Sequence, residues 1–352
     1  MMLDLMSESS LVALIGLVGG IFLGFAARIG RFCTLGAIED LHYGENALRL
    51  RMWGIAIGVA VFGTFGLSAM GLLDLQQTLY LSIAWNPVAS IVGGLLFGYG
   101  MALAGNCGYG ALARVGGGDL RALLIVLVMG ISAYMTLGGP FSGLRIWLFG
   151  ATEPTTAAPS FAHALAGATA LPVNGVGMAI GCAILALTLL SRELRASTSH
   201  IIWGAVVGLT IVSAWAGTQW VANNGYDATR VVSHTFSAPI GETLIYAMTS
   251  SGNSISFGTG SVIGVVLGAL IGSLIKGQFR WEACDDAREL RRQILGGALM
   301  GAGAIIAVGC SVGQGLSAFS VLSYGAPLTF ACIMIGAAIG LRQLILGFSP
   351  PV

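Results

Sequence analysis

The chain has 352 residues, of which 56% are apolar and only 9% are charged, against about 25% charged in an ordinary soluble domain. A bilayer penalises every charge placed in it, so this composition indicates an integral membrane protein and excludes a soluble one. The net charge is +1 and no basic cluster stands clear of the apolar segments, so nucleic acid is not an expected partner.

Nine apolar segments are long enough to cross a bilayer, at roughly 17 to 22 residues each. In chain order they are Leu11–Ile29, Met52–Leu73, Val88–Asn106, Ala122–Pro140, Pro172–Leu190, Ile201–Gly217, Phe257–Ile275, Gln293–Gly309 and a last one from about Ala326. The sequence before the first segment has no Lys or Arg, so we do not expect a cleaved signal peptide. The predicted fold is all-α, with about nine transmembrane helices in a single transmembrane transporter domain over residues 1–352.

Five segments between these spans are too short or too polar to cross, yet too apolar for plain loops. They are Arg31–Leu41, Cys107–Gly117, Phe141–Phe149, Ile240–Met248 and Cys310–Leu322. Irregular backbone at membrane depth is tolerated only where protein or a water-filled cavity satisfies it. The segments are therefore predicted to be short re-entrant helices that line a central route.

Alternation of nine spans places fourteen of the sixteen Lys and Arg residues on one side of the membrane. Only Arg145 and Arg230 fall on the other side. By the positive-inside rule, the N-terminus is predicted to lie outside and the C-terminus in the cytoplasm.

Two pieces of the chain repeat, Gly93–Gly110 (GGLLFGYGMALAGNCGYG) and Gly296–Gly313 (GGALMGAGAIIAVGCSVG). They match at eight of eighteen positions, without gaps. The predicted topology makes their spans antiparallel, so the repeat is inverted, and inverted repeats gather a transporter's site near mid-depth. We expect a first half of about 1–150 and a second of about 172–352, centred on Cys107 and Cys310.

Three cysteines, Cys33, Cys107 and Cys310, each follow an apolar segment and are bracketed by glycine. Glycine permits a tight break and exposes backbone N–H groups, while a following short helix directs its positive dipole end at the same place, which suits an anion. We expect the three thiols to stay protonated and to contact a sulfur-bearing solute. Seven supporting candidates lie in or beside these turns: Arg31, Gly105, Gly110, Arg114, Gly309, Ser311 and Gly313.

All six cysteines occur singly, with no C-x-x-C pair, which argues against a dithiol redox centre or a zinc site. No metal, no cofactor and no catalytic residue is expected. Cys182 and Cys332 lie inside predicted spans and are interpreted as small buried apolar residues. No predicted span has an Asp or Glu in its interior, so the sequence does not support proton coupling through carboxylates.

The chain resembles the YeeE/YedE family of bacterial inner-membrane sulfur transporters, the thiosulfate permeases. The motifs that carry the resemblance are GRFCTLGAIED, AGNCGYG with Arg114 and Gly116 following, and GGALMGAGAIIAVGCSVGQG. The resemblance implies an hourglass-shaped helical fold, and uptake of thiosulfate through a waist lined by three cysteines that match Cys33, Cys107 and Cys310. It also implies a small cytoplasmic sulfur-carrier partner of the TusA-like type.

Tyr109 stands where the family often has threonine, so a transporter of a selenium compound or another sulfur compound stays open. Two further hypotheses come from other classes. One is a membrane-embedded sulfurtransferase or thiol oxidoreductase with a persulfidated cysteine, which the missing paired cysteines disfavour. The other is a passive water or solute channel, which the glycine-tight packing disfavours.

Overall fold

A computed structural model describes residues 7–151, 153–155, 158–226, 229–283 and 286–346. This part of the chain contains helices and no strand. The long helices are α1 (Glu8–Arg28), α3 (Leu48–Ala69), α4 (Pro87–Ala104), α6 (Leu120–Leu137), α9 (Val173–Leu189), α11 (Thr198–Asn224), α13 (Phe257–Ile275), α14 (Ala287–Ile306) and α15 (Gly325–Leu346). The short ones are α2 (Thr34–Tyr43), η1 (Leu75–Gln77), α5 (Gly108–Gly116), α7 (Ser142–Phe149), α8 (Phe161–Thr169), α10 (Arg192–Ala196), α12 (Ala238–Thr249) and the π-helix η2 (Gly313–Ala318).

A long helix lies at each of the nine predicted spans. Seven candidate spans are long and apolar enough to cross a membrane, or eight if α8 and α9, bent at 116°, form one span. The remaining helix, α14, falls short because its first two turns carry Arg288, Glu289, Arg291 and Arg292. The chain is therefore an all-α, multi-pass membrane protein.

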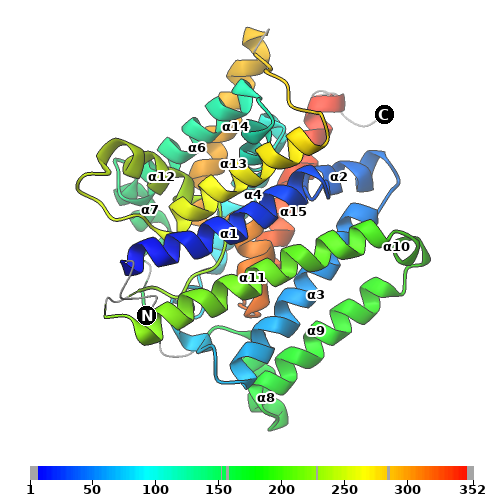
Figure 1. The fold of residues 1–352 in the computed structure, drawn as a ribbon, viewed down its shortest axis with the longest axis vertical. Helices are drawn as coiled ribbons and strands as arrows, with labels where there is room; N and C mark the ends of the chain where they lie inside the picture. Colours follow the sequence, from blue (N-terminus) through cyan, green and yellow to red (C-terminus); the bar gives the residue numbers. More distant parts are fainter. Residues whose placement is uncertain (1–6, 152, 156–157, 227–228, 284–285, 347–352) are drawn as a thin grey trace.

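The same order of helices occurs twice, as long, short, long, long, short, long. It runs from α1 to α6, and again from α11 to α15 with the η2 helix as its second short member. The packing follows this order reciprocally, because α1 packs on α13 and α11 on α3, while α4 packs on α15 and α14 on α6 (Figure 1). Helices α7 to α10 lie between the two sets along the chain, and α9 packs on α3.

The repeat helices α4 and α14 cross through glycines that touch backbone to backbone. A methyl group added at Gly93 would lie 2.7 Å from Gly303 O, and one at Gly303 would lie 2.8 Å from Gly93 O. Gly100 and Gly296 oppose each other in the same way, at 2.7 and 2.6 Å. Gly296 and Gly303 are the repeat equivalents of Gly93 and Gly100, so the contact is reciprocal and the two helices are antiparallel. The inverted repeat predicted from the sequence is present, and α14 shares the depth of α4.

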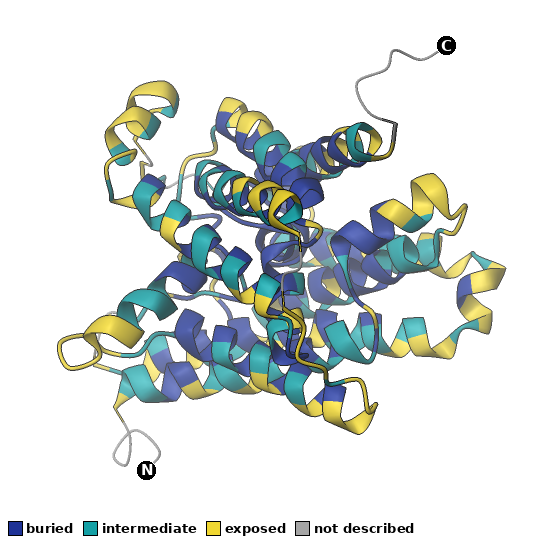
Figure 2. Cartoon of the chain, turned by 90° about the horizontal axis from the view of Figure 1, so that it is seen from above, coloured by how far each residue is buried: buried dark blue, intermediate teal, exposed yellow. Residues whose placement is uncertain are grey.

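Helix α1 packs against α13 through a parallel row of glycines in which Gly20 and Gly264 meet. Close backbone approach of this kind is the usual way in which helices associate in lipid. Figure 2 shows the buried residues on the inward sides of the helices, with exposed residues at their ends and outer faces. Many of the exposed residues are large and apolar, among them Leu187, Ile202 and Ile339, as expected for surfaces covered by acyl chains.

Short helices lie at all five segments predicted as re-entrant, with two corrections. Helix α5 continues α4, and the two form one candidate span, Pro87–Gly116, rather than a span and a returning hairpin. Helix α7 has no buried residue, so it does not dip into the protein as predicted; only its Arg145 and Phe149 side chains reach the cavity described below. Other apolar side chains of the helix, such as Trp147 at 79% exposure, lie on the outer surface.

Candidate functional site

Each of the three predicted cysteines stands at the first position of a short helix, directly after a sharp break. The residue two positions before each one has a positive φ: Arg31 at 56°, Gly105 at 74° and Val308 at 55°. The cysteine carbonyl then accepts the first helical hydrogen bond, from the N–H of Ala37, Ala111 or Gln314 at 3.1, 2.8 and 2.8 Å. Three helix N-termini, of α2, α5 and the helix that contains η2, therefore begin at a thiol.

Backbone N–H groups donate to two of the sulfurs. The N–H of Gly110 points at Cys107 Sγ, 3.3 Å away, and the N–H of Gly313 points at Cys310 Sγ, 3.4 Å away. Cys310 Sγ also accepts the N–H of Phe236 at 3.3 Å and lies 3.7 Å from Thr235 Oγ1. These donors give the two sulfur sites the polarity that an anion requires.

The three thiols lie in one cluster. Cys107 is fully buried and Cys310 is 1% exposed, while Cys33 is partly exposed. The Cys107 thiol is within electrostatic range of both Cys33 and Cys310, and the Ser311 hydroxyl lies beside it. Every polar contact of Cys107 and Cys310 in the described part of the chain is thus with an N–H, a hydroxyl or another thiol.

Among the described residues, two buried hydroxyl groups in this cluster have no nitrogen or oxygen as a hydrogen-bond partner. They belong to Thr34 and Ser311, the residues that directly follow Cys33 and Cys310, and both side chains are almost completely buried. A buried polar group without a partner costs roughly 1–3 kcal/mol. Such groups in a native structure call for an explanation, and a ligand that they bind is one.

Aromatic rings enclose the cluster. Tyr109 packs between Phe32 and Phe236, with ring centroids 6.5 and 5.4 Å apart, and Phe32 stacks on Trp53 at 4.6 Å. The Tyr109 hydroxyl donates to Leu23 O at 2.6 Å, which ties the start of α5 to α1. The rings exclude water around the thiols and so strengthen any electrostatic contact made there.

The second half of the chain has no cysteine where the first half has Cys33. Phe236 and Ser237 occupy the places of Phe32 and Cys33, because Ser237 directly precedes α12 as Cys33 precedes α2. The two halves are therefore alike in backbone and different in chemistry, with hydroxyls on the Cys310 side and a third thiol on the Cys107 side.

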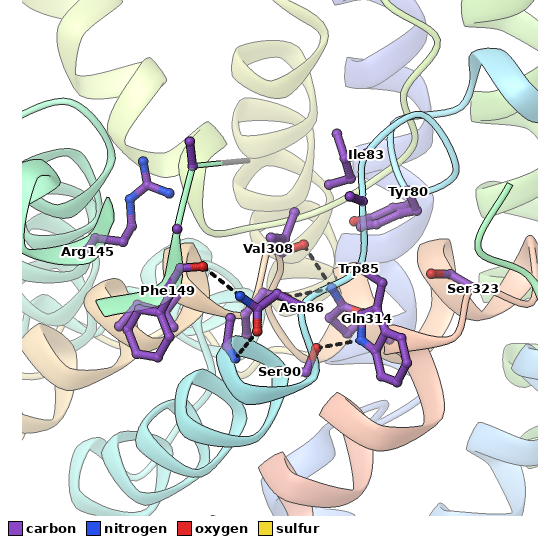
Figure 3. A pocket seen from close by; sticks show the side chains of 17 residues that line it. Tyr80, Ile83, Trp85, Asn86, Ser90, Arg145, Phe149, Val308, Gln314 and Ser323 are labelled. Atoms are coloured by element: carbon purple, nitrogen blue, oxygen red, sulfur yellow. Dashed lines mark hydrogen bonds between the residues drawn. The ribbon is translucent and has the colours of Figure 1, made fainter. Parts of the chain in front are cut away.

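A cavity of about 70 Å³ reaches from the surface to the vicinity of Cys310. Its lining includes Tyr80, Val308, Gln314 and Arg145, with Arg145 and Tyr80 on opposite sides and Gln314 between them (Figure 3). The Tyr80 hydroxyl lies beside Thr235, which in turn contacts Cys310. The cavity therefore leads to the first thiol through two hydroxyl groups.

Gln314 holds the break before Cys310 closed. Its Nε2 donates to Ala307 O and Val308 O, at 2.8 and 2.9 Å, while its Oε1 is buried and has no partner. Gln314 lies in the π-helix η2, and π-helical turns are frequent at functional sites. The Gln314 side chain thus lies against the backbone that directly follows α14.

Charged residues gather at the other end of the cluster, near Cys33. Arg31 is exposed, and Arg49 reaches the face of α2 at Gly36 and pairs with Asp40 at 3.1 Å. Burial raises the pKa of Glu39, against the opposing effects of Arg114 and Arg49. This end of the site carries the charge that the buried thiols lack.

The predicted site residues are not all in one place. Gly105, Gly110, Gly309, Ser311 and Gly313 lie at the cysteine breaks, as predicted. Arg31 lies at the surface beside Cys33, and Arg114 lies at the far end of α5, away from the thiols. Thr34, Tyr80, Thr235 and Gln314, none of them predicted from the sequence, also lie at the cysteine cluster or at the cavity beside it. Thr34 could have been found, because a hydroxyl residue follows the cysteine in both GRFCT and VGCS.

Comparisons with known proteins point to a single family. The sequence signature of a family described as "Sulphur transport" matches residues 29–339. The chain is 28% identical over 334 residues to "Thiosulfate transporter TsuA" of Escherichia coli (strain K12), and the alignment covers 91% of each chain. It is 26% identical over 334 residues to "Thiosulfate transporter TsuA" of Spirochaeta thermophila, with 91% of this chain and 96% of the relative covered.

Proposed function

The chain belongs to the sulphur transport family, and on this premise we propose that it imports thiosulfate, or a closely similar sulfur oxyanion, past Cys310, Cys107 and Cys33 in turn. The names of the two relatives support thiosulfate as the solute. The observation that carries the proposal is the cluster of three thiols at three helix N-termini, with the buried Ser311 hydroxyl beside Cys107.

The chemistry of the cluster suits such a solute. An anion that leaves water needs donors in place of its hydration shell, and N–H groups, hydroxyls and neutral thiols supply them without a fixed charge that would trap it. A neutral thiol donates weakly and a thiolate only accepts, so the thiols act in their protonated form. The terminal sulfur of thiosulfate is soft and polarisable, as are the three sulfurs that it would meet.

The proposed route begins in the cavity of Figure 3, where Arg145 attracts the anion. The anion then passes the hydroxyls of Tyr80 and Thr235 to reach Cys310, moves between Ser311 and Cys107, and leaves past Cys33 and Thr34. In this conformation Cys310 and Cys107 are both buried. Passage therefore needs a small movement at Tyr80 or Gln314.

We place the protein in the bacterial inner membrane with its N-terminus outside and its C-terminus in the cytoplasm. The distribution of Lys and Arg supports this orientation. Reporter domains fused to each terminus test it, since a periplasm-dependent reporter would be active only at the N-terminus.

A small TusA-like sulfur-carrier protein is the proposed acceptor on the cytoplasmic side. Cys33 supports this assignment, because it is the one partly exposed thiol of the three. Co-purification of such a carrier with the wild-type protein, and its loss with Cys33→Ser, would be the expected result.

The decisive experiment is uptake of sulfur-35-labelled thiosulfate by cells that lack other sulfur-uptake routes. The intact chain should restore uptake and growth on thiosulfate. Labelled selenium compounds and sulfate in the same cells test the solute, and a failure to import thiosulfate would remove the substrate assignment.

We further propose that the protein is not an enzyme. A membrane sulfurtransferase would carry a persulfide on a cysteine during turnover. Intact-mass spectrometry of protein purified after exposure to thiosulfate should find no added sulfur, and a stable adduct on Cys33, Cys107 or Cys310 would favour the enzyme instead.

A further inference from the structure

A second polar cavity lies away from the thiols, where α1, α5 and α13 end and α6 begins. Its volume is about 360 Å³, and its lining is Arg28, Arg114, Gly117, Asp119, Gln278 and Glu282. The size is within the range of small-molecule sites. The predicted orientation places this cavity on the cytoplasmic side.

Two arginines from different helices face the cavity without an acidic partner. Arg28 ends α1, and its Nη2 donates to Gln278 O at 3.0 Å, while its Nε is buried and has no partner. Arg114 lies in the last turn of α5 and is exposed. Among the described residues, neither has a carboxylate oxygen within 4 Å.

A third arginine, Arg121, pairs with both acidic residues of the cavity. Arg121 contacts Glu282 Oε2 at 3.1 Å and Asp119 Oδ1 at 3.5 Å. Asp119 Oδ1 also accepts the first N–H groups of α6, from Arg121 and Ala122. Counted with Arg121, three arginines and two carboxylates leave a net charge of +1 at the cavity. Arg28 and Arg114 are the arginines there that make no ion pair within 4 Å among the described residues, with Glu39 in electrostatic range of Arg114.

The backbone around the cavity is built to admit the Arg28 side chain. A methyl group added at Gly117 would lie 3.1 Å from both Cζ and Nη2 of Arg28, so this position leaves just the room that the guanidinium needs. Backbone hydrogen bonds from Arg280 and Glu282 to Gly117 O and Gly118 O, both 3.1 Å, hold the loop after α13 against the end of α5. Arg28 thus contacts a loop that is itself bonded to the end of α5, the helix that carries Arg114.

From this geometry we infer that the cavity binds a tetrahedral oxyanion of the sulfate or phosphate class between Arg28 and Arg114. Planar guanidinium forks match such oxyanions with paired N–H donors. The site is separate from the thiol cluster, and its occupancy does not depend on which solute the protein imports. A bound oxyanion would join the end of α1, which leads into the Cys33 break, to the end of α5, which starts at Cys107.

The oxyanion could be a soluble ion or a phospholipid headgroup, since both present the same chemistry at this depth. The test begins with the full-length protein in a neutral detergent, titrated with sodium sulfate and with inorganic phosphate by isothermal titration calorimetry. A second arm measures retention of phosphatidylglycerol by native mass spectrometry, with phosphatidylcholine as the comparison lipid. Binding in the first arm assigns a soluble ion, and selective retention in the second arm alone assigns a headgroup.

Variants decide whether the arginines are responsible. Arg114→Gln should weaken binding about tenfold or more, Arg114→Lys should weaken it less, and Arg292→Gln, a control on α14 outside the cavity, should leave it unchanged. Arg28→Gln should match Arg114→Gln; if it unfolds because the Gln278 contact is lost, the exposed Arg114 alone decides. The triple variant with Cys33, Cys107 and Cys310 changed to Ser should bind as the wild type does.

Absence of binding in both arms by the intact protein would overturn the inference. So would equal binding by Arg114→Gln and the wild type. Because neither readout involves transport, a negative result for thiosulfate uptake leaves this test intact, and the reverse also holds.

Discussion

Cys107 and Cys310 accept the same hydrogen bond in the two halves of the chain, from the backbone N–H of the glycine three residues later. The matching local geometry means that each sulfur is held by the first turn of its own helix, to which Phe236 N adds a second N–H donor at Cys310. The two thiols are therefore predicted to contribute separately to transport.

Replacing either thiol should abolish uptake without unfolding the protein. We expect Cys107→Ala and Cys310→Ala each to lower thiosulfate uptake at least about tenfold, because the anion loses a donor at a buried step of its route. The measurement is the initial rate of labelled uptake, normalised to the amount of protein in the membrane. Cys332→Ala, at a buried thiol in α15, should transport normally, and full activity in Cys107→Ala or Cys310→Ala would refute the proposed route.

Removing the Ser311 hydroxyl should lower the rate of uptake without lowering the stability of the protein. Since the Cys107 thiol is the one polar group found beside this hydroxyl among the described residues, and a thiol is a weak hydrogen-bonding group, Ser311→Ala should change the apparent melting temperature little, while uptake falls several-fold. Ser320→Ala is the matched control, because Ser320 accepts the indole N–H of Trp215 at 2.9 Å and donates to Ser317 O at 2.8 Å. It should lower the melting temperature, and a stability loss in Ser311→Ala with normal uptake would mean that Ser311 is structural.

The Tyr80 hydroxyl is predicted to pass the anion from the outer cavity to Cys310. Tyr80→Phe keeps the ring, which packs edge-on against Trp215 at 6.5 Å, but removes the hydroxyl beside Thr235. We expect uptake to fall several-fold with little change in protein amount. Tyr99→Phe loses a hydroxyl bonded to Gln343, away from the route, and should transport normally; equal rates for both variants would exclude a role for Tyr80.

The glycine crossing of α4 and α14 should not tolerate a side chain. Gly303→Ala places a methyl group 2.6 Å from Phe97 N and 2.8 Å from Gly93 O, so the helices must separate, at a cost of about 1–3 kcal/mol. The apparent melting temperature in detergent should fall by several degrees. Gly66→Ala in α3, where a methyl group would meet nothing within 4 Å, should be neutral.

The sequence predicted those features of the fold that come from the internal repeat or from the apolar composition. Apolar length located the helices, and the match between Gly93–Gly110 and Gly296–Gly313 predicted an antiparallel pair that the reciprocal glycine contacts confirm. The glycine-flanked cysteines were correctly placed at helix breaks. The re-entrant interpretation of the segment after Cys107 was wrong, because a break does not by itself reveal whether the next helix turns back or continues.

Tyr80 and Thr235 could not be found from the sequence, because both lie in loops between helices and no motif marks them. Tyr80 lies between α3 and α4, and Thr235 lies between α11 and α12. Each reaches the Cys310 side of the cluster only through tertiary packing. Arg114 is the opposite case. Its motif places it close to Cys107 in sequence, but α5 carries it two helical turns away from that thiol.

The reciprocal contacts of Gly93 with Gly303 and of Gly100 with Gly296 are those of an isologous interface, in which one patch meets a copy of itself after a half-turn. A polypeptide equivalent to one half would carry both contact surfaces needed to form a dimer with a second copy inserted in the opposite orientation. Because both halves belong to one chain, each can change its sequence independently, and Cys33 in the first half against Ser237 at the equivalent place in the second is one such difference.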